Sequence, residues 1–154
     1  MLGYNSLIQA LAEALAVNID IATFLTQCGY GSLSVFVGED AANPLGETQT
    51  PYIILAPSAS ASDMAECQET VNIGIEIDFG IVKKGETTAN SITTYTGIPH
   101  TDAFAQLVYK AVAGALGEFQ HITKADYALI YDRFPLFEGG ISFTVEVEQG
   151  VSDS

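Results

Sequence analysis

The sequence predicts an α+β fold, a mostly antiparallel mixed sheet packed on one face by a long helix and a short N-terminal helical pair. Residues 70–82 and 141–148 alternate strictly between apolar and polar side chains, which is the pattern of a half-buried strand. Residues 101–116 repeat their apolar side chains at helical spacing. Helical and strand patterns do not alternate regularly along the chain, so a parallel sheet built from strand–helix–strand units is not expected.

The first thirty residues predict the helical pair. Ser6 opens a Ser-x-x-Gln capping box, which predicts a helix over residues 6–17. Asp20 is the expected N-cap of a second short helix. Gly29 is expected to end that helix, because glycine readily adopts the left-handed conformation that follows many helices. Cys28 falls on the apolar face of the second helix and is expected in the core.

Two shorter strands are expected next. Leu33–Gly38 is rich in β-branched and aromatic residues, and Pro51–Pro57 is an apolar run bounded by prolines. The segment between them, Gly38–Thr50, is polar and contains a proline, two glycines and three acidic residues. It is expected to be a long loop, and loops of that length are usually functional or mobile.

The strongest helical pattern lies in the second half of the chain. Thr101 or His100 is the expected N-cap, with Asp102 favourably placed in the first turn. Gly117 is expected to end the helix. Its apolar face is Phe104, Leu107, Val108, Ala111 and Ala115. The alanines on this face indicate close packing against a sheet.

A hairpin is expected to close the fold. Residues 127–137 and 140–148 are predicted to pair through a short loop at Glu138–Gly140. The segment Gly85–Pro99 is polar and Thr-rich. Two alternatives remain open for it, the second arm of a hairpin or an extended loop.

The composition fits one domain over residues 1–154, with residues 149–154 as a flexible tail.

Nineteen acidic and five basic residues give a net charge of −14. This charge disfavours ordinary duplex binding, which needs Lys and Arg to neutralise phosphates, and attraction to an anionic membrane. The simplest reading is a soluble acidic protein kept apart by self-repulsion. No apolar run approaches the roughly 20 residues that span a bilayer, and no signal-peptide pattern follows Met1, so synthesis in the cytosol is expected.

No residue pattern predicts a catalytic site, a metal site or a cofactor site. Cys28 and Cys67 lack metal-binding spacing. His100 is expected beside a helix cap, and His121 is expected after a helix end, where an imidazolium complements the dipole. Folding can bring either histidine to Cys67, so a small hydrolase or thiol enzyme is the minor alternative to a non-enzymatic protein.

Paired carboxylates mark the polar faces of both long strands, Glu76 and Asp78 in the first and Glu146 and Glu148 in the second. Like charges that lie directly opposite in a sheet are destabilising. The simpler interpretation is therefore that the two strands are not neighbours and that each face is solvated. The other interpretation is that the acids line a passage or face partners, because a negative wall offers a polyanion no neutralising contacts.

The order of elements resembles tail-terminator and tail-completion (neck) proteins of long-tailed bacteriophages. The resemblance is carried by a short N-terminal helical pair, "PYIIL", the long strand "ETVNIGIEIDFGIV", a helix beginning "HTDAFAQLVYKAV" and a closing strand pair ending "GGISFTVEVE". It covers residues 5–148 and lies in layout and size rather than in a diagnostic motif. The strong acidity of this chain exceeds what the family pattern requires, which leaves open which surfaces face a channel.

The resemblance implies a non-enzymatic structural protein of the virion tail or neck, assembled in the host cytoplasm. Such a protein forms a homo-oligomeric ring, expected to be a hexamer, at the head-proximal end of the tail. The ring ends tail-tube polymerisation and joins the tail to the head, and DNA passes through its channel without specific binding. The implied partners are further copies, the tail-tube protein and a head–tail connector or stopper protein, with no cofactor and no membrane. The alternatives are a head–tail connector, adaptor or other neck protein, or an acidic monomeric protein-binding module.

Two groups of site residues follow from this reading. The candidate channel-lining acids are Glu76, Asp78, Glu146 and Glu148. The candidate contacts to a neighbouring subunit or to the tail tube are Glu39, Asp40, Glu47, Lys83 and Lys84. They lie in or beside polar segments of the kind that become ordered when they bind a partner. The two lysines can pair with carboxylates of a neighbour, and the plainer alternative for them is an exposed turn.

Overall fold

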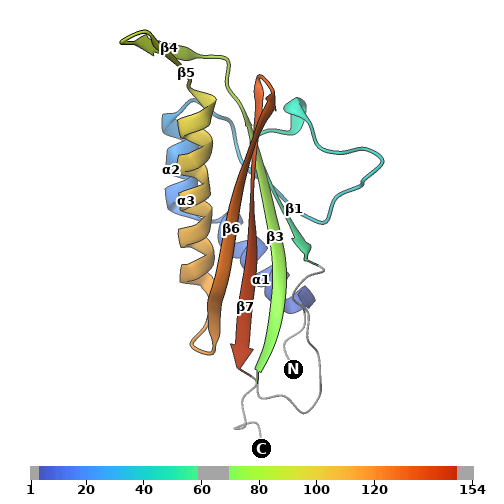
Figure 1. The fold of residues 1–154 in the computed structure, drawn as a ribbon. Helices are drawn as coiled ribbons and strands as arrows, with labels where there is room; N and C mark the ends of the chain where they lie inside the picture. Colours follow the sequence, from blue (N-terminus) through green and yellow to red (C-terminus); the bar gives the residue numbers. More distant parts are fainter. Residues whose placement is uncertain (1–3, 59–69, 149–154) are drawn as a thin grey trace, which may run out of the picture.

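The structure, a computed structural model, describes residues 4–58 and 70–148. It confirms the α+β fold, in which the described residues form three α-helices, a five-stranded mixed sheet and a separate two-stranded hairpin (Figure 1). The expected tail at 149–154 lies outside these residues. The elements in chain order are α1 (Tyr4–Ala16), α2 (Ile19–Gln27), β1 (Ser34–Val37), the 3-10 helix η1 (Glu47–Gln49), β2 (Tyr52–Pro57), β3 (Thr70–Val82), β4 (Glu86–Ala89), β5 (Ile92–Tyr95), α3 (Gly97–Ala115), β6 (Gln120–Arg133) and β7 (Leu136–Glu148).

The main sheet is built around the pairing of β3 with β7. Its strand order is β1-β2-β3-β7-β6, with β1 parallel to β2 and every other pair antiparallel. The two central strands pair along their full length, from Thr70 opposite Glu148 to Val82 opposite Leu136. The strands expected to be long therefore lie side by side in the middle of the sheet.

The two edges of the sheet differ. The β6 edge has 14 residues, and its register with β7 shifts between Ile122 and Lys124 and again between Ile130 and Arg133. The β1 edge has only four residues and is followed by Gly38, which has a positive φ of 83°.

Helices α1, α2 and α3 cover one face of the sheet, and the core lies between the two layers (Figure 1). Alternate residues of β3 and β7 point into this core, as the sequence pattern predicts. The Phe104 ring of α3 lies 5.1 Å from the Phe79 ring of β3, centroid to centroid. The strand side chains in the core are Val71, Ile73, Ile75, Ile77, Phe79, Ile81, Phe137, Ile141, Phe143, Val145 and Val147.

The N-terminal helical pair is confirmed, but its caps differ from the expected ones. α1 already begins at Tyr4, so Ser6 lies inside the helix rather than at its N-cap. Asn18, not Asp20, caps α2, because its side chain accepts a hydrogen bond from the Ile21 N–H at 2.9 Å. The short side chain of Asn18 comes directly before the helix, whereas Asp20 lies within the first turn.

Gly29 ends α2 as predicted. Its φ is 81°, and the next residue, Tyr30, donates its N–H to the Leu25 carbonyl at 2.8 Å. The Gly29 N–H bonds to the Thr26 carbonyl. These two bonds form a Schellman motif. Cys28 is half-buried, a weaker burial than the core position expected for it.

α3 begins one turn earlier than predicted. His100 and Thr101 were the expected caps, but the helix starts at Gly97 and contains both. Pro99 lies in the first turn, where its missing N–H would have no partner within the helix, so it does not mark the boundary. Thr101 is fully buried and donates its hydroxyl to the Gly97 carbonyl at 2.6 Å.

The predicted loop at Glu138–Gly140 is wrong. These residues lie inside β7, and the chain turns at Phe134 and Pro135 between β6 and β7. The glycines are needed for close packing rather than for a turn. A β-carbon at Gly139 would lie 2.5 Å from the Phe79 ring, and Gly140 makes room for a carboxylate on the opposite face.

The segment Gly85–Pro99 contains a hairpin of its own followed by the start of α3. β4 pairs with β5, not with the main sheet. The turn residues Asn90 and Ser91 have φ values of 52° and 64°, as a two-residue type I′ turn requires. The hairpin projects from the body at the N-terminal end of α3 (Figure 1).

We expect Gly97→Ala to lower the free energy of unfolding by about 1–3 kcal/mol, because a β-carbon there overlaps the Phe137 ring in a packed core. Gly114→Ala is the matched control in the same helix, since a β-carbon at Gly114 meets open space. This variant should be stabilised by up to about 1 kcal/mol. Urea denaturation followed by circular dichroism measures both. Equal effects from the two variants would contradict the tight contact.

Candidate functional site

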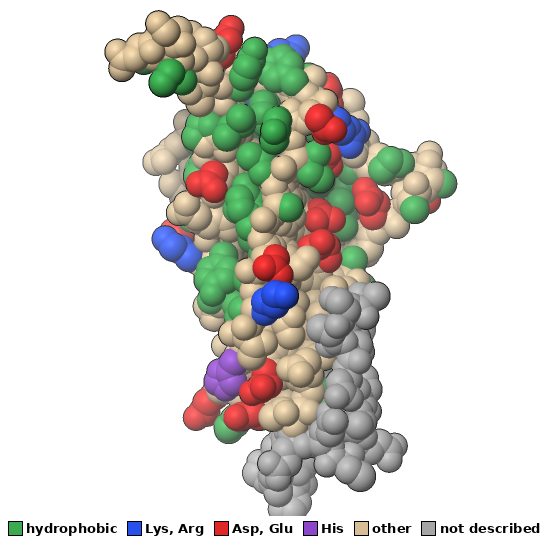
Figure 2. Space-filling model, viewed as in Figure 1, with side chains coloured by type: hydrophobic (Ala, Val, Ile, Leu, Met, Phe, Trp, Pro, Cys, Tyr) green, Lys and Arg blue, Asp and Glu red, His purple; other side chains and the backbone are tan. Residues whose placement is uncertain are grey.

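The four predicted channel-lining acids lie on one face of the main sheet, the face that α1, α2 and α3 leave uncovered. Glu76 and Asp78 are in β3, and Glu146 and Glu148 are in β7. The interpretation that the two strands are not neighbours is wrong, because β3 and β7 pair directly. Figure 2 shows acidic side chains gathered over these central strands.

The register keeps the carboxylates from facing one another. Glu76 lies opposite Ser142, and Asp78 lies opposite Gly140. The Ser142 hydroxyl donates a hydrogen bond to Glu76 Oε2 at 2.9 Å. Among the strand pairs of the described residues, no two carboxylates are register partners. The sheet therefore carries many acids on one face without the directly opposed pairs that destabilise it most.

The predicted acids form two groups rather than one. Glu146 and Glu148 lie at the end of β7, where Glu146 is flanked by Asn72 of β3 and His121 of β6. Glu146 is four residues along β7 from Ser142, the partner of Glu76, so the groups are about 13 Å apart along the strand. His121 lies in β6, not at the end of a helix as expected, and faces an acid instead of a helix dipole.

The group in the middle of the sheet is larger than the sequence indicates. Glu138 of β7 and Glu39, from the loop after β1, join Glu76 and Asp78, and we call these four residues the acidic cluster. Partial burial, followed by the charges of Glu76, Glu39 and Glu138, raises the pKa of Asp78 to about 6.

Gly140 explains how an exposed residue such as Asp78 has a shielded carboxyl group. A β-carbon at Gly140 would lie 2.6 Å from Asp78 Oδ1. The carboxylate therefore rests against the backbone of β7 at Gly140, which shields part of it from solvent. Any larger residue at position 140 would displace it.

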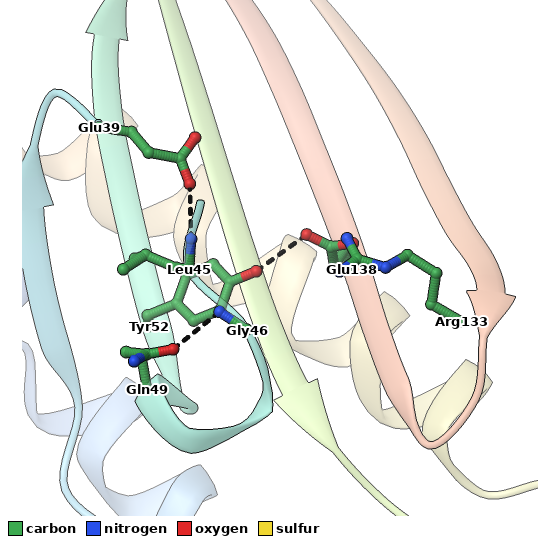
Figure 3. A network of polar contacts seen from close by, with 7 residues as sticks. All are labelled: Glu39, Leu45, Gly46, Gln49, Tyr52, Arg133 and Glu138. Atoms are coloured by element: carbon green, nitrogen blue, oxygen red, sulfur yellow. Dashed lines mark hydrogen bonds and ion pairs between the residues drawn. The ribbon is translucent and has the colours of Figure 1, made fainter. Parts of the chain in front are cut away.

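A tyrosine and an arginine hold one member of the acidic cluster in place (Figure 3). The Tyr52 hydroxyl donates to Glu138 Oε2, and Arg133 Nη1 donates to Glu138 Oε1, both at 2.9 Å. Tyr52 is buried, and its ring packs over Gly80. Burial, and then the Glu138 carboxylate that accepts its hydrogen bond, raise the pKa of Tyr52.

The loop residues predicted to contact partners have roles within the loop itself. Glu39 Oε2 accepts the Leu45 N–H at 3.0 Å, so this side chain fastens the loop beside the sheet (Figure 3). Asp40 accepts hydrogen bonds from Ala42 and Asn43, and the Asn43 side-chain bond is the main reason for its lowered pKa. Glu47 begins η1. Contacts from these residues to another chain remain predictions.

The two lysines of the predicted contact set differ in their surroundings. Lys84 is exposed, whereas Lys83 is half-buried with its Nζ 5.7 Å from the centre of the Tyr30 ring, a cation–π contact. The Tyr30 hydroxyl and His100 Nδ1 form a hydrogen bond of 2.8 Å, which joins the end of α2 to the start of α3. Burial, with a smaller contribution from Lys83, lowers the pKa of His100.

Sequence reasoning missed Glu138, Tyr52, Arg133 and Gly140. The available signal was the Gly139–Gly140 pair inside a β-rich segment, which can indicate close approach to a backbone as well as a turn. Cys67, on which the thiol-enzyme alternative depends, lies outside the described residues. Within residues 4–58 and 70–148, no group of three or more His, Cys, Asp or Glu side chains is arranged to hold a metal ion.

We expect the Asp78 carboxyl to make stability fall as the pH rises from its ordinary pKa of 3.8 to about 6. The reason is that the folded protein holds this proton more tightly than the unfolded chain does. Asp78→Asn should therefore gain about 0.5–1 kcal/mol over the wild type at high pH, a value reduced for solvent screening.

The measurement is urea denaturation at about pH 4, near the lower end of this range, and at about pH 8, above it. Glu148→Gln is the control, because it removes one carboxylate from the same face at the far end of the sheet. A gain for Asp78→Asn that is equal at both pH values, or equal to that of the control, would contradict the shielded carboxyl.

Within the described residues, no single helix is both long and apolar enough to cross a bilayer. The helix pair Ser6–Ala16 and Ile19–Gln27, bent by 45°, is long and apolar enough when the two helices are taken together.

No protein-family model and no curated protein matches the sequence. Among solved structures, the chain is similar to the gp17 protein of bacteriophage SPP1, with a TM-score of 0.47 and 13% sequence identity over 97% of this chain and 93% of that one.

Proposed function

We propose that this chain is a structural protein of a phage virion, which forms a ring at the head-proximal end of the tail. The ring ends tail-tube polymerisation and joins the tail to the head connector or stopper, and DNA passes through its channel. The proposal starts from the resemblance of the sequence to tail-terminator and tail-completion proteins. The layout that carries the resemblance is that of the fold, with two N-terminal helices, early strands, a long central strand, a long helix and a closing strand pair.

The observation that carries the proposal is the uncovered acidic face. The acidic cluster brings four carboxylates together, and the pKa of Asp78 is raised first by its partial burial and then by the charges of the other three. Arg133 forms an ion pair with Glu138 at the side of the cluster. Such crowding opposes folding, and local features that oppose folding are expected at functional or strained sites. The basic side chains of this face, Arg133 and Lys124, are paired with Glu138 and Asp126. A strongly acidic wall of this kind offers a polyanion few neutralising contacts and lets it slide past without adhering. The channel of a tail needs a wall of this kind.

The ring would form through a contact between two different surfaces of the chain, because only such contacts close into rings. The loop Gly38–Thr50 and the hairpin β4–β5 are the segments best placed to reach a neighbouring copy or the tube below. Both are polar and lie outside the helix–sheet layers (Figure 1).

The acidic cluster also favours a second function, a monomeric module that docks a basic protein on the same face. This alternative needs no ring and predicts binding that weakens as salt rises. The state of association in solution separates the two.

We expect the molar mass by light scattering to show closed species of about six copies at high protein concentration, with a central hole in negative-stain images. Salt should favour them, because screening reduces repulsion between strongly acidic chains. Open filaments, or dimers as the largest species at any salt concentration, would contradict the ring. A monomer under every condition that binds cationic peptides would support the docking module instead.

A charge reversal tests the channel directly. We expect Glu76→Lys with Glu146→Lys, one change in each acidic group, to slow DNA ejection from assembled particles, because lysines bind phosphates. The slowing should lessen as salt rises. The control is Glu13→Lys with Asp20→Lys, which makes the same charge change on exposed positions of α1 and α2. Unchanged ejection kinetics in particles that assemble normally would remove the channel assignment.

A further inference from the structure

Three members of the acidic cluster are held by the sheet, and the fourth is not. Glu76 and Glu138 each accept hydrogen bonds from side chains of the sheet. The Asp78 carboxylate rests on the backbone at Gly140, and Glu76 Oε2 lies over the same glycine, 4.0 Å from the place that a β-carbon would take. Glu39 comes from a loop instead. If the charges of the cluster repel one another, the loop is the part that can move.

The backbone brings Glu39 to the cluster at the end of β1. The Gly38 N–H bonds to the Leu55 carbonyl at 2.8 Å, so the chain follows β2 up to this point. Ala56, the next residue of β2, is the register partner of Glu76. Gly38 has a positive φ of 83° and turns the chain away from the sheet. Glu39 is therefore the residue at which the loop Gly38–Thr50 leaves the sheet, beside the strand that carries Glu76.

Glu39 also fastens this loop. Its Oε2 accepts the Leu45 N–H at 3.0 Å, across six residues of the loop (Figure 3). The tip of the loop has separate hydrogen bonds, in which Ala42 and Asn43 donate to Asp40. The Glu39–Leu45 bond therefore ties the loop to the cluster, while the tip keeps its shape through bonds of its own.

The charged and titratable groups around Asp78 come from every element beside it. They are Glu76 of β3, Glu138 of β7, Glu39 of the loop, Tyr52 of β2, and Arg133, Lys124 and Asp126 of β6. Arg133 is ion-paired with Glu138, and Lys124 is ion-paired with Asp126. The pKa of Tyr52 is raised, so its hydroxyl stays protonated. The proton on Asp78 is the charge of this set that changes near neutral pH.

The position of Glu39 and the proton on Asp78 affect each other. Partial burial, followed by the charges of Glu76, Glu39 and Glu138, raises the pKa of Asp78 to about 6. Coupling between two sites is reciprocal. Because the charge of Glu39 hinders the ionisation of Asp78, the ionisation of Asp78 disfavours Glu39 in its place by the same free energy.

We propose that the loop Gly38–Thr50 is a pH-dependent strap, which the Glu39–Leu45 bond holds against the acidic cluster while Asp78 is protonated and which loosens when Asp78 is ionised. The fastened loop binds the Asp78 proton more tightly than the released loop does, so a rise in pH favours release. This device works within one chain and does not depend on the ring. The same loop is proposed above to reach a neighbouring copy, so its availability for that contact would depend on pH.

The test is hydrogen exchange of the Leu45 amide, measured by NMR on the full-length protein. Wild type and Asp78→Asn are compared at the same pH, so the intrinsic exchange rate of this amide cancels. At about pH 7, exchange should be about fivefold faster in the wild type, at the lower end of typical couplings because solvent screens these carboxylates. At about pH 5 the two rates should be nearly equal, because Asp78 is then mostly protonated.

The Ala42 amide is the internal control, since it bonds to Asp40 within the tip of the loop. Its exchange should be equal in the two proteins at both pH values. Equal Leu45 rates in wild type and Asp78→Asn at about pH 7 would overturn the proposal. Faster exchange of Ala42 together with Leu45 would also overturn it, because the whole loop would then be unfolding instead of being released.

A second variant pair tests whether the charge of Glu39 transmits the effect. Glu39→Gln keeps an oxygen that can accept the Leu45 N–H but has no charge, so adding Asp78→Asn to this variant should no longer slow Leu45 exchange. Glu47→Gln is the matched control, because it neutralises an exposed acid of the same loop outside the acidic cluster. In that background Asp78→Asn should still slow the exchange. An effect of Asp78→Asn that persists in Glu39→Gln would overturn the proposal.

Discussion

The pairing of β3 with β7 is the constraint on which the rest of the structure depends. Thirteen residues of each strand run antiparallel without a shift, so every side chain on one strand has a fixed partner and a fixed face. One face receives the apolar residues that the helices cover, and the other receives the acids. Gly139 and Gly140 make this register possible, because the Phe79 ring fills the space beside one and the Asp78 carboxylate rests on the other. A shift of the strand pairing by one residue would move the apolar side chains to the solvent face and the acidic side chains into the core.

Much of the fold can be predicted from periodicity. The alternation in residues 70–82 identifies both the strand and its buried face, and the same holds for β7. The helices were found because their apolar residues recur at helical spacing, but their first residues were misplaced. His100 or Thr101 was read as the cap of α3 although both lie inside the helix, which begins at Gly97, and Ser6 was read as a cap although α1 begins before it. Local signals of this kind do not distinguish a cap from a position one turn further on.

The acidic cluster was only half visible in the sequence, for a physical reason. Glu76 and Asp78 are neighbours along one strand, so a local pattern finds them. Glu138 and Glu39 reach the same place from β7 and from a distant loop, which depends on register and on the loop's own hydrogen bonds. The glycine pair was assigned to a turn because turns are the commoner use of glycine. In the structure the two glycines make room for the Phe79 ring and the Asp78 carboxylate, which lie some sixty residues earlier in the sequence.

The unequal edges of the sheet limit how copies of this chain can associate. The long β6 edge carries two register shifts and the charged residues Lys124, Asp126 and Arg133, whereas β1 offers only four residues before Gly38 turns the chain away. Irregular, charged and very short edges discourage strands of different molecules from joining into a continuous sheet. These edges therefore disfavour the growth of fibres by backbone hydrogen bonding between strands when many copies lie close together. Recognition between molecules is left to side chains, which can be specific where backbone pairing cannot.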